Sequence, residues 1–272
     1  MDTLPHLIEP AELHQRLGAP GLVLVDLSAG EVYQQGHIPG ALPVDYSRCV
    51  STQGRAGGML PEPPALSALC AGLGLRHDSQ VVACDDEQGR KASRFLWTLD
   101  VLGHSHHALL NGGRAAWQAE GRPLTTLPAM SPQRSVFHAL VNKAPIASRD
   151  DILARLHDPD VVLVDARSPA EYRGEDLRAA RGGHIPGAVN IEWKTLLDPA
   201  RGGRFRPADT LLARLTAAGV TPDKLVIVYC QTHRRSALLY YALRHYLAYP
   251  RVKGYPGSWS EWGNLPDSPI EH

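Results

Sequence analysis

Short runs of consecutive apolar residues alternate along this chain with longer segments in which apolar residues recur at helical spacing. A continuous apolar run of about four to eight residues indicates a strand covered on both faces, as in a parallel sheet between two layers of helices. The pattern therefore predicts an α/β fold built of three-layer domains, each a parallel sheet flanked by helices. The predicted strands are Leu22–Asp26, Gln80–Cys84, Val161–Asp165 and Leu225–Tyr229. The predicted helices are Pro10–Leu17, Pro64–Leu73, Ala92–Leu102, Arg149–Leu156, Ala208–Ala218 and Ser236–Leu247.

The chain is a tandem repeat of one unit. The segment His37–Ala41 recurs letter for letter as His184–Ala188, and two other pairs of segments resemble each other at nearly the same separation, roughly 145 residues. Between the copies lies a polar, proline-bearing stretch without a periodic pattern, which is interpreted as a linker. We therefore predict an N-terminal domain over 1–127, a linker over 128–145 and a C-terminal domain over 146–272.

The repeat separates features of the fold from features of one copy only. Asp26 and Asp165 end equivalent strands, so we expect both to accept hydrogen bonds from nearby backbone N–H groups. The Gly and Pro of the repeated His-Ile-Pro-Gly-Ala motif fit a tight turn in both copies. Cys230, by contrast, falls on Asp85, which begins three consecutive acidic residues. Because a carboxylate cluster repels anions and cannot act as a thiolate nucleophile, the first domain is predicted to be catalytically inactive.

A loop of polar and basic side chains joins the strand that ends at Tyr229 to the helix that follows it. The loop contains a thiol, a histidine and two arginines, and no acidic residue. Free cysteine has a pKa of ~8.5, so only about 3% is thiolate at pH 7, whereas a thiol beside guanidinium groups and a helix start ionises more readily. Ligands also bind at the carboxyl ends of strands in open α/β sheets. The candidate nucleophile is Cys230, and the candidate substrate-binding residues are Gln231, Thr232, His233, Arg234, Arg235 and Ser236.

The cysteines and the loop histidine each have a structural alternative to a catalytic role. A cysteine at the end of a strand is commonly a buried, inert core residue. That is our interpretation of Cys49, Cys70 and Cys84. For Cys230, the neighbouring Arg234 and Arg235 favour a catalytic role, because their two guanidinium groups would repel each other unless an anion or the thiolate lay between them. His233 is equally compatible with tuning the thiol, with contacting a substrate and with facing solvent.

Composition and charge narrow the classes of function. The chain has 272 residues, of which 43% are apolar and 21% charged, an ordinary balance for globular domains. Lys plus Arg equals Asp plus Glu at 28 each, so nothing global favours nucleic acid or an acidic membrane surface. The four cysteines are widely spaced, and His104, His106 and His107 are interpreted as a solvated loop, so we predict no disulfide framework, metal site or other cofactor. We see no signal-peptide pattern and no membrane-length apolar run, and therefore expect a cytoplasmic location.

The two α/β copies, the repeated His-Ile-Pro-Gly-Ala motif and the Cys-x4-Arg loop together resemble the two-domain rhodaneses, the thiosulfate sulfurtransferases. The resemblance covers essentially the whole chain, and the Cys-Gln-Thr-His-Arg-Arg loop is similar to that of a bacterial branch of the family. It implies that Cys230 attacks the outer sulfur of thiosulfate, releases sulfite and carries the sulfur as a persulfide to cyanide or another thiophile, a protein acceptor included. It also implies that the loop amides and Arg235 hold the anionic donor, while Ser236 caps the helix.

Two positions depart from the vertebrate-type members of that family. Glu171 stands where those proteins carry an Arg, and Thr232 stands where they carry a Lys, so positive charge is lost at both positions. Arg234 is expected to compensate from within the loop. The related mercaptopyruvate sulfurtransferases carry Cys-Gly-Ser/Thr-Gly-Val at the loop, which this chain lacks, and they stay the alternative assignment. The insertion Arg173–Gly183, present only in the second copy, is expected to form part of the rim of the site.

Two further classes of function stay open. Cysteine-dependent phosphatases of related fold use a Cys-x5-Arg loop, whereas Arg235 is the fifth residue after Cys230, so this loop is one residue short of surrounding a phosphoryl group. The other alternative is a non-catalytic module that binds an anion or a protein partner. The acidic first copy fits such a scaffold, and the intact loop of the second copy favours catalysis.

Overall fold

The computed structural model describes residues 4–272, which form two compact units that are interleaved along the sequence. Unit 1 contains the described residues up to Cys49, Pro61–Asn142 and Asp198–Phe205. Unit 2 contains Val50–Leu60, Lys143–Leu197 and Arg206–His272. Each unit therefore includes a short segment from the other half of the chain, which the predicted domain limits do not take into account. Those limits stay a prediction, and the intervening residues 128–145 contain neither helix nor strand.

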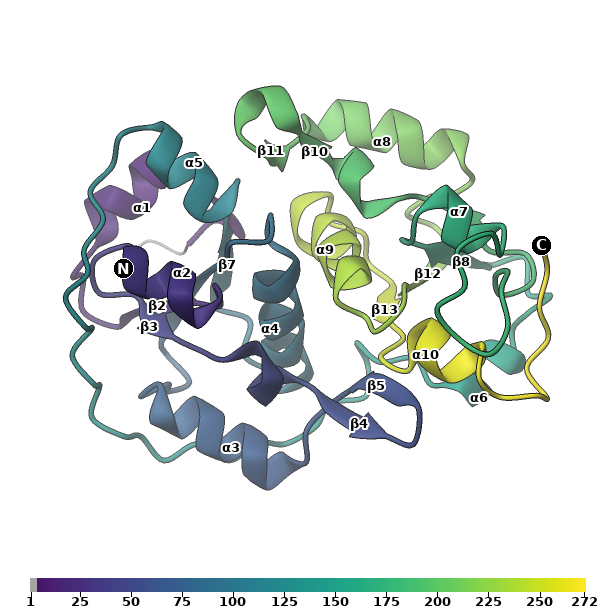
Figure 1. The fold of residues 1–272 in the computed structure, drawn as a ribbon, viewed down its shortest axis with the longest axis horizontal. Helices are drawn as coiled ribbons and strands as arrows, with labels where there is room; N and C mark the ends of the chain where they lie inside the picture. The colour runs from purple at the N-terminus through teal and green to yellow at the C-terminus, as the bar shows by residue number, and fades with distance from the viewer. Residues whose placement is uncertain (1–3) are drawn as a thin grey trace. The chain divides into compact units, whose positions relative to one another are not determined.

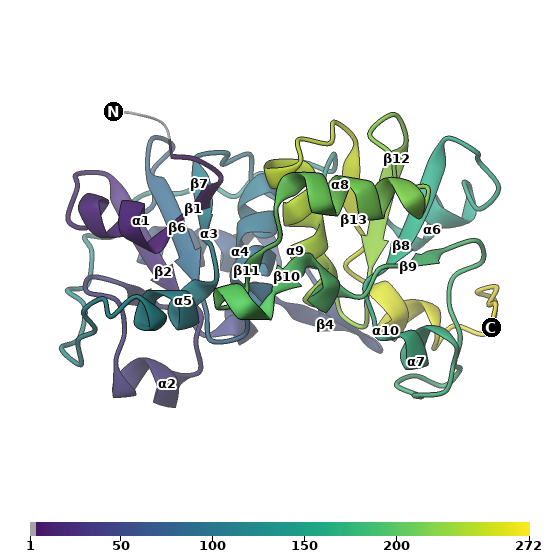
Figure 2. The same ribbon diagram turned by 90° about the horizontal axis from the view of Figure 1, so that it is seen from above.

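Unit 1 is built on a five-stranded parallel sheet (Figure 1). In sheet order the strands are β1 (Leu7–Ile8), β7 (His107–Leu110), β6 (Gln80–Cys84), β2 (Leu22–Asp26) and β3 (Leu42–Pro43). Its helices are α1 (Pro10–Arg16), α2 (Gly30–Gln35), α3 (Pro63–Gly72), α4 (Arg90–Val101) and α5 (Gly113–Ala119), with a 3-10 turn at Tyr46–Cys49. Leu13 of α1, Tyr33 of α2 and Trp117 of α5 pack on one face of the sheet. Helix α4 covers the opposite face, so the unit has three layers (Figure 2).

Unit 2 repeats this plan with a four-stranded parallel sheet. In sheet order the strands are β13 (Val252–Gly254), β12 (Leu225–Tyr229), β8 (Val161–Asp165) and β9 (Val189–Asn190). Its helices are α6 (Arg149–Leu153), α7 (Pro169–Tyr172), α8 (Ala208–Ala217), α9 (Arg235–Tyr241) and α10 (Ser258–Trp262), with a 3-10 turn at Trp193–Leu196. Ile152 of α6 and Trp259 and Trp262 of α10 pack on one face, and α9 packs on the other. The predicted α/β architecture of two sheets flanked by helices is confirmed.

Two hairpins account for the interleaving of the units. Strands β4 (Ser51–Gln53) and β5 (Ala56–Met59) pair antiparallel and belong to unit 2, where β5 lies against α10 (Figure 1). Strands β10 (Leu197–Asp198) and β11 (Arg204–Phe205) form the equivalent hairpin of the second copy, and its residues from Asp198 onward belong to unit 1. There the Phe205 amide donates to the Asn111 side chain (2.9 Å), and the Arg204 guanidinium donates to Glu9 (2.9 Å). Between β10 and β11 the chain makes a 3-10 turn, η3 (Pro199–Arg201).

The hydrophobic pattern predicts the central strands correctly and the last long helix incorrectly. All four predicted strands have the predicted limits. The predicted helix Ser236–Leu247, however, is two elements: α9 ends at Tyr241, and a π-helical turn follows over Ala242–Tyr246. In this turn the Leu247 amide donates to the Ala242 carbonyl (2.8 Å), a bond over five residues that widens the helix. Among residues 4–272, no helix is long and apolar enough to cross a membrane.

The repeated motifs have the same structure in both copies, as expected for features of the fold. Asp26 accepts the Ser28 amide (2.8 Å) and Asp165 accepts the Arg167 amide (2.9 Å). Each His-Ile-Pro-Gly-Ala segment closes a turn with a 3.0 Å backbone hydrogen bond, from Ala41 to Ile38 and from Ala188 to Ile185. The predictions of a backbone-capping aspartate and a tight turn are confirmed.

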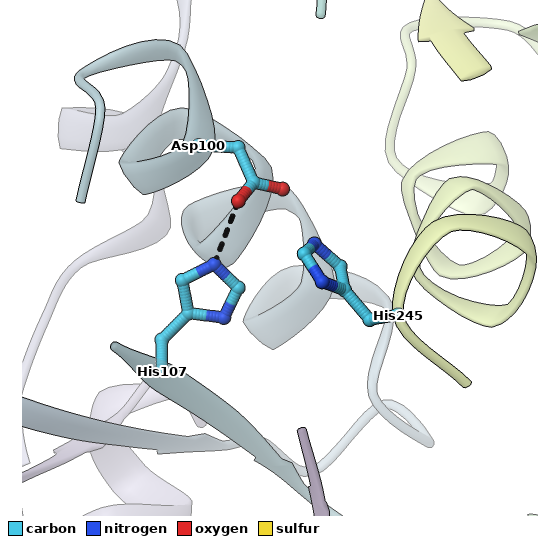
Figure 3. Close-up of side chains that lie close together, drawn as sticks. All are labelled: Asp100, His107 and His245. Carbon is cyan, nitrogen blue, oxygen red and sulfur yellow. Dashed lines mark hydrogen bonds and ion pairs between the residues drawn. The ribbon is translucent and has the colours of Figure 1, made fainter. Parts of the chain in front are cut away.

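The interpretation of the clustered histidines as a solvated loop is wrong for two of the three. His107 is the first residue of β7, is buried, and its Nε2 lies 2.9 Å from Asp100 Oδ1 of α4 (Figure 3). His104 is also buried, and burial lowers its pKa to about 4, so its ring is neutral at pH 7. Only His106 is exposed. The sequence pattern does not indicate that His107 is buried, because the strand that contains it, β7, is only four residues long.

Candidate active site

Cys230 lies at the carboxyl end of β12, where parallel sheets present loops to ligands. The residues between Cys230 and the start of α9 form a compact loop, and backbone hydrogen bonds join the start of this loop to α10. The Trp259 amide donates to the Cys230 carbonyl (2.9 Å), and the Ser260 amide donates to the Gln231 carbonyl (2.9 Å). The Cys230 residue is only 1% exposed, so the surrounding loop controls its chemistry.

The ionisation of Cys230 is governed by two opposing effects. Burial of the thiol is the largest single effect and raises its pKa. The positive charge of Arg235, together with hydrogen bonds from Ser236 and from the Thr232 amide, acts in the other direction and outweighs burial, so the pKa of Cys230 lies below its ordinary value. The site therefore favours a thiolate at the end of β12.

The other three cysteines have the opposite character. Burial raises the pKa of Cys49 and of Cys70 to about 12, and it raises the pKa of Cys84 well above its ordinary value. All four cysteines are free. Of the four cysteines, Cys230 alone has neighbours whose stabilisation of the thiolate outweighs burial, which agrees with the prediction that Cys49, Cys70 and Cys84 are structural.

The Arg235 guanidinium is paired with Glu171 of α7, which the sequence analysis did not foresee. Its two terminal nitrogens donate to the two carboxylate oxygens of Glu171 at 2.5 and 2.7 Å. The Glu171 side chain is 2% exposed and also accepts the Ser168 amide at 3.1 Å. Burial opposes ionisation of Glu171, but the bonds and charge of Arg235 prevail and lower its pKa to about 2. The bidentate fork of Arg235 is therefore engaged by a protein carboxylate.

Of the other predicted substrate-binding residues, some are partly exposed and some are buried inside the loop. Gln231, Thr232 and Arg234 are partly exposed, and Gln231 donates to the Arg178 carbonyl (2.9 Å) in the insertion. His233 is fully buried, and its Nδ1 lies 2.8 Å from the Ser236 hydroxyl, so the alternative in which His233 faces solvent is wrong.

The prediction that Ser236 caps the helix is also wrong. Helix α9 begins at Arg235, its N-cap position is Arg234, and no side chain makes a capping hydrogen bond there. Ser236 is instead inside the first turn, fully buried, with its hydroxyl shared with His233. The helix starts one residue earlier than the apolar pattern indicates, because an apolar pattern cannot register an arginine as the first helical residue.

The β4–β5 hairpin packs against both the catalytic loop and α10, although its residues belong to the first copy. The Gly57 amide donates to the Ser260 hydroxyl (3.2 Å). A Cβ atom on Gly58 would lie 2.3 Å from the Thr232 carbonyl oxygen and 2.6 Å from that of Pro256, closer than van der Waals contact permits. Only glycine therefore fits at position 58, since the backbone there touches the catalytic loop directly.

The equivalent loop of the first copy is occupied by its own carboxylate. Asp85 is buried, and its two oxygens accept four backbone N–H groups at 2.7–2.9 Å. The amides come from Glu87, Gly89, Lys91 and Ala92. The first copy thus keeps the ring of amides at its strand end and fills it internally. The acidic loop is therefore an anion site already satisfied by Asp85, rather than simply a repulsive cluster.

Comparisons with known proteins bear on both copies. The family model of the rhodanese-like domain matches residues 9–120 and 148–265. A thiosulfate sulfurtransferase of Azotobacter vinelandii is 50% identical over 270 residues, which cover 99% of this chain and 98% of that protein. A sulfur carrier protein of Thermus thermophilus, TtuD, is 38% identical over 252 residues, covering 88% of this chain and 86% of that protein. The crystal structure of SseA from Escherichia coli, a 3-mercaptopyruvate sulfotransferase by its description, matches with a TM-score of 0.82 at 28% identity, covering 94% of this chain and 99% of that chain.

Proposed function

This chain belongs to the rhodanese-like domain family, and we propose that it is a thiosulfate sulfurtransferase that works through a persulfide on Cys230. The observation that carries the proposal is the Cys230 loop, which holds a buried thiol with a lowered pKa at the carboxyl end of β12. The relative from Azotobacter vinelandii, which matches nearly the whole chain, supports thiosulfate as the donor. A cytoplasmic location, where thiols stay reduced, fits the four free cysteines.

The reaction divides into two displacements at sulfur. The Cys230 thiolate attacks the outer sulfur of thiosulfate, a new S–S bond forms, and the old S–S bond breaks with its electron pair leaving on sulfite. A thiophile then attacks the outer sulfur of the persulfide, and the Cys230 thiolate departs in its original state. Cyanide yields thiocyanate in this step, and a thiol acceptor yields a new persulfide. No external oxidant or reductant is consumed in either step.

The loop residues stabilise the negative charge that persists through both steps. Arg235 acts on the sulfur through its positive charge while Glu171 fixes the position of its guanidinium, and hydrogen bonds from the amides of Thr232 and Ser236 also favour the thiolate. Gln231, Thr232 and Arg234 are partly exposed and are the loop residues that meet the donor. His233 and Ser236 shape the loop from inside through their shared hydrogen bond.

The donor and the acceptor each have a second candidate. The likeness to SseA of Escherichia coli favours 3-mercaptopyruvate as the alternative donor. The likeness to a sulfur carrier protein of Thermus thermophilus favours a protein among the acceptors, in addition to small thiophiles. We place thiosulfate first because the relative that shares half of its residues with this chain carries that name.

Intact-mass analysis tests the persulfide directly. The wild type is expected to gain one sulfur atom after incubation with thiosulfate and to lose it after cyanide. Cys230→Ser is expected to gain none, whereas Cys84→Ser, which removes a buried thiol of raised pKa, is expected to behave as the wild type. Sulfur found on Cys49, Cys70 or Cys84 in place of Cys230 would overturn the assignment.

Alkylation by iodoacetamide tests the thiolate independently of any sulfur donor. Because the pKa of Cys230 is lowered, its alkylation rate is expected to reach half of its maximum at a pH below the ~8.5 of free cysteine. Cys230→Ser measures the background from the other thiols. Arg235→Ala should move the midpoint to higher pH, since it removes the charge that stabilises the thiolate. A wild-type midpoint at or above that of free cysteine would contradict the electrostatic account of the loop.

A further inference from the structure

Ser258, the first residue of α10, accepts hydrogen bonds from two backbone amides of the catalytic loop, those of Cys230 and His233. Its hydroxyl oxygen accepts the Cys230 amide at 3.3 Å and the His233 amide at 3.1 Å, and its proton is donated to the Tyr255 carbonyl at 2.7 Å. The residue is fully buried. The hydroxyl therefore makes three hydrogen bonds, two of which fix the direction of backbone amides in the loop that carries the thiol.

The backbone at Ser258 is held in a strained conformation. Its φ is +51°, and His233, which donates to it, has a φ of +54°. Of the non-glycine residues that the structure describes, only four have positive φ, and two of them are this bonded pair. Such a conformation is unfavourable for residues with a Cβ and persists where the surroundings enforce it, commonly at functional sites.

The first copy offers an internal comparison for this position. Gly113 is the repeat equivalent of Ser258 and has the same backbone conformation, with a φ of +57°. Gln88, the equivalent of His233, is likewise at a φ of +60°. The fold therefore requires a positive φ at this position in both copies, and glycine adopts a positive φ without strain. The hydroxyl is present only in the copy that carries the thiol.

The amides of the two loops show what the hydroxyl adds. In the first copy, the Glu87 and Lys91 amides donate to Asp85. Their equivalents in the second copy, the amides of Thr232 and Ser236, are among the groups that lower the pKa of Cys230 by hydrogen bonding to its thiolate. The amides of Cys230 and His233 are instead bound by Ser258. Ser258 thus binds two amides of the loop, while two others favour the ionised form of Cys230.

We propose that Ser258 is a positioning residue for sulfur transfer: its hydroxyl holds the amides of Cys230 and His233 and thereby fixes the backbone of the loop around the reacting sulfur. This inference rests on the proposed function, because it assigns a role in that reaction. Ser258 acts through the loop backbone and does not take part in bond making or breaking.

Two substitutions separate the hydroxyl from the backbone strain. Ser258→Ala removes the hydroxyl and keeps a Cβ at positive φ, whereas Ser258→Gly removes the hydroxyl and reproduces the residue of the first copy. We expect kcat for sulfur transfer from thiosulfate to fall by about ten- to a hundredfold in both variants, since both leave two buried amides without an acceptor. The thermal midpoints should differ, with Ser258→Gly more stable than Ser258→Ala.

The control is Ser268→Ala, which removes another buried hydroxyl of unit 2, one that is bonded to Arg149 rather than to the loop. Its kcat and its iodoacetamide profile should match the wild type. In both Ser258 variants the alkylation midpoint should move to higher pH, because the amides that stabilise the thiolate lose their alignment. This readout needs no sulfur donor.

The outcomes distinguish the inference from the function on which it rests. Wild-type kcat and an unshifted alkylation profile in Ser258→Gly would overturn the positioning role, as would a loss confined to Ser258→Ala, which would assign the effect to strain alone. If the wild type accepts no sulfur from thiosulfate but the alkylation midpoint moves in both Ser258 variants, the proposed function fails while the role of Ser258 in aligning the loop stands.

Discussion

Arg235→Ala is expected to lower kcat/KM for thiosulfate by about ten- to a hundredfold or more and to destabilise the protein at the same time. The charge of Arg235 stabilises the Cys230 thiolate, and a charge-assisted interaction of this kind is worth roughly 1.5–3 kcal/mol. The substitution also leaves Glu171 buried without the partner that holds both of its oxygens, and breaking a buried ion pair costs about 3–5 kcal/mol. Steady-state kinetics with thiosulfate and with mercaptopyruvate at fixed ionic strength, and urea unfolding, measure the two losses.

Two further variants separate the effect on activity from the effect on folding. Arg235→Lys should recover little of either, because lysine cannot reproduce the two parallel hydrogen bonds to Glu171. Combining Arg235→Ala with Glu171→Gln removes the unpaired carboxylate and should restore much of the stability but not the activity. Unchanged thiosulfate turnover in Arg235→Ala, or a wild type that prefers mercaptopyruvate, would contradict our account of this loop as a site for a thiosulfate anion.

Asp85→Ala is expected to have its large effect on stability rather than on chemistry. The substitution leaves four backbone amides without an acceptor, three of them in buried hydrogen bonds. Each buried group costs about 1–3 kcal/mol, so we expect a loss of roughly 3 kcal/mol or more in the free energy of unfolding. Sulfur transfer should stay within a few fold of the wild type wherever the variant is folded, because unit 1 carries no thiolate at this position. Urea unfolding and transfer assays on the same preparation measure both quantities.

Asp86→Ala is the matched control for Asp85→Ala. Asp86 lies next to Asp85 but is partly exposed and bonded to the Lys91 side chain (3.2 Å), so its removal should change stability far less. Asp85→Asn, which keeps one carbonyl oxygen, should fall between the two. A folded Asp85→Ala variant that loses transfer as completely as Cys230→Ser would show that the acidic loop takes part in the reaction.

The sequence pattern predicts central features of this fold better than peripheral ones. The four central strands are continuous apolar runs, and all four have the predicted limits. Edge strands such as β1, β3 and β9 are only two residues long, which is too short for any periodicity to register. The hairpin strands are only two to four residues long, and no local pattern indicates to which unit a hairpin belongs.

The chemistry of the loop was partly accessible from sequence because its charges are adjacent in the chain. Cys230 and Arg235 are separated by a few residues, whereas Glu171 is 64 residues from Arg235, so only the folded chain brings that pair together. The sequence also carries a signal for Ser258. This residue replaces Gly113 of the first copy, and a difference between repeats at an otherwise equivalent position marks a feature of one copy alone.

The interleaved hairpins bear on how this duplicated gene can change. A gene that encoded only the second copy would lack residues 50–60, including Gly57 and Gly58, which lie against the catalytic loop. A gene that encoded only the first copy would lack residues 198–205, which complete unit 1 through Arg204 and Phe205. Neither half can be deleted without removing structure from the unit that remains. Selection on catalysis in the second copy therefore preserves the first, even though Asp85 occupies the place of its thiol.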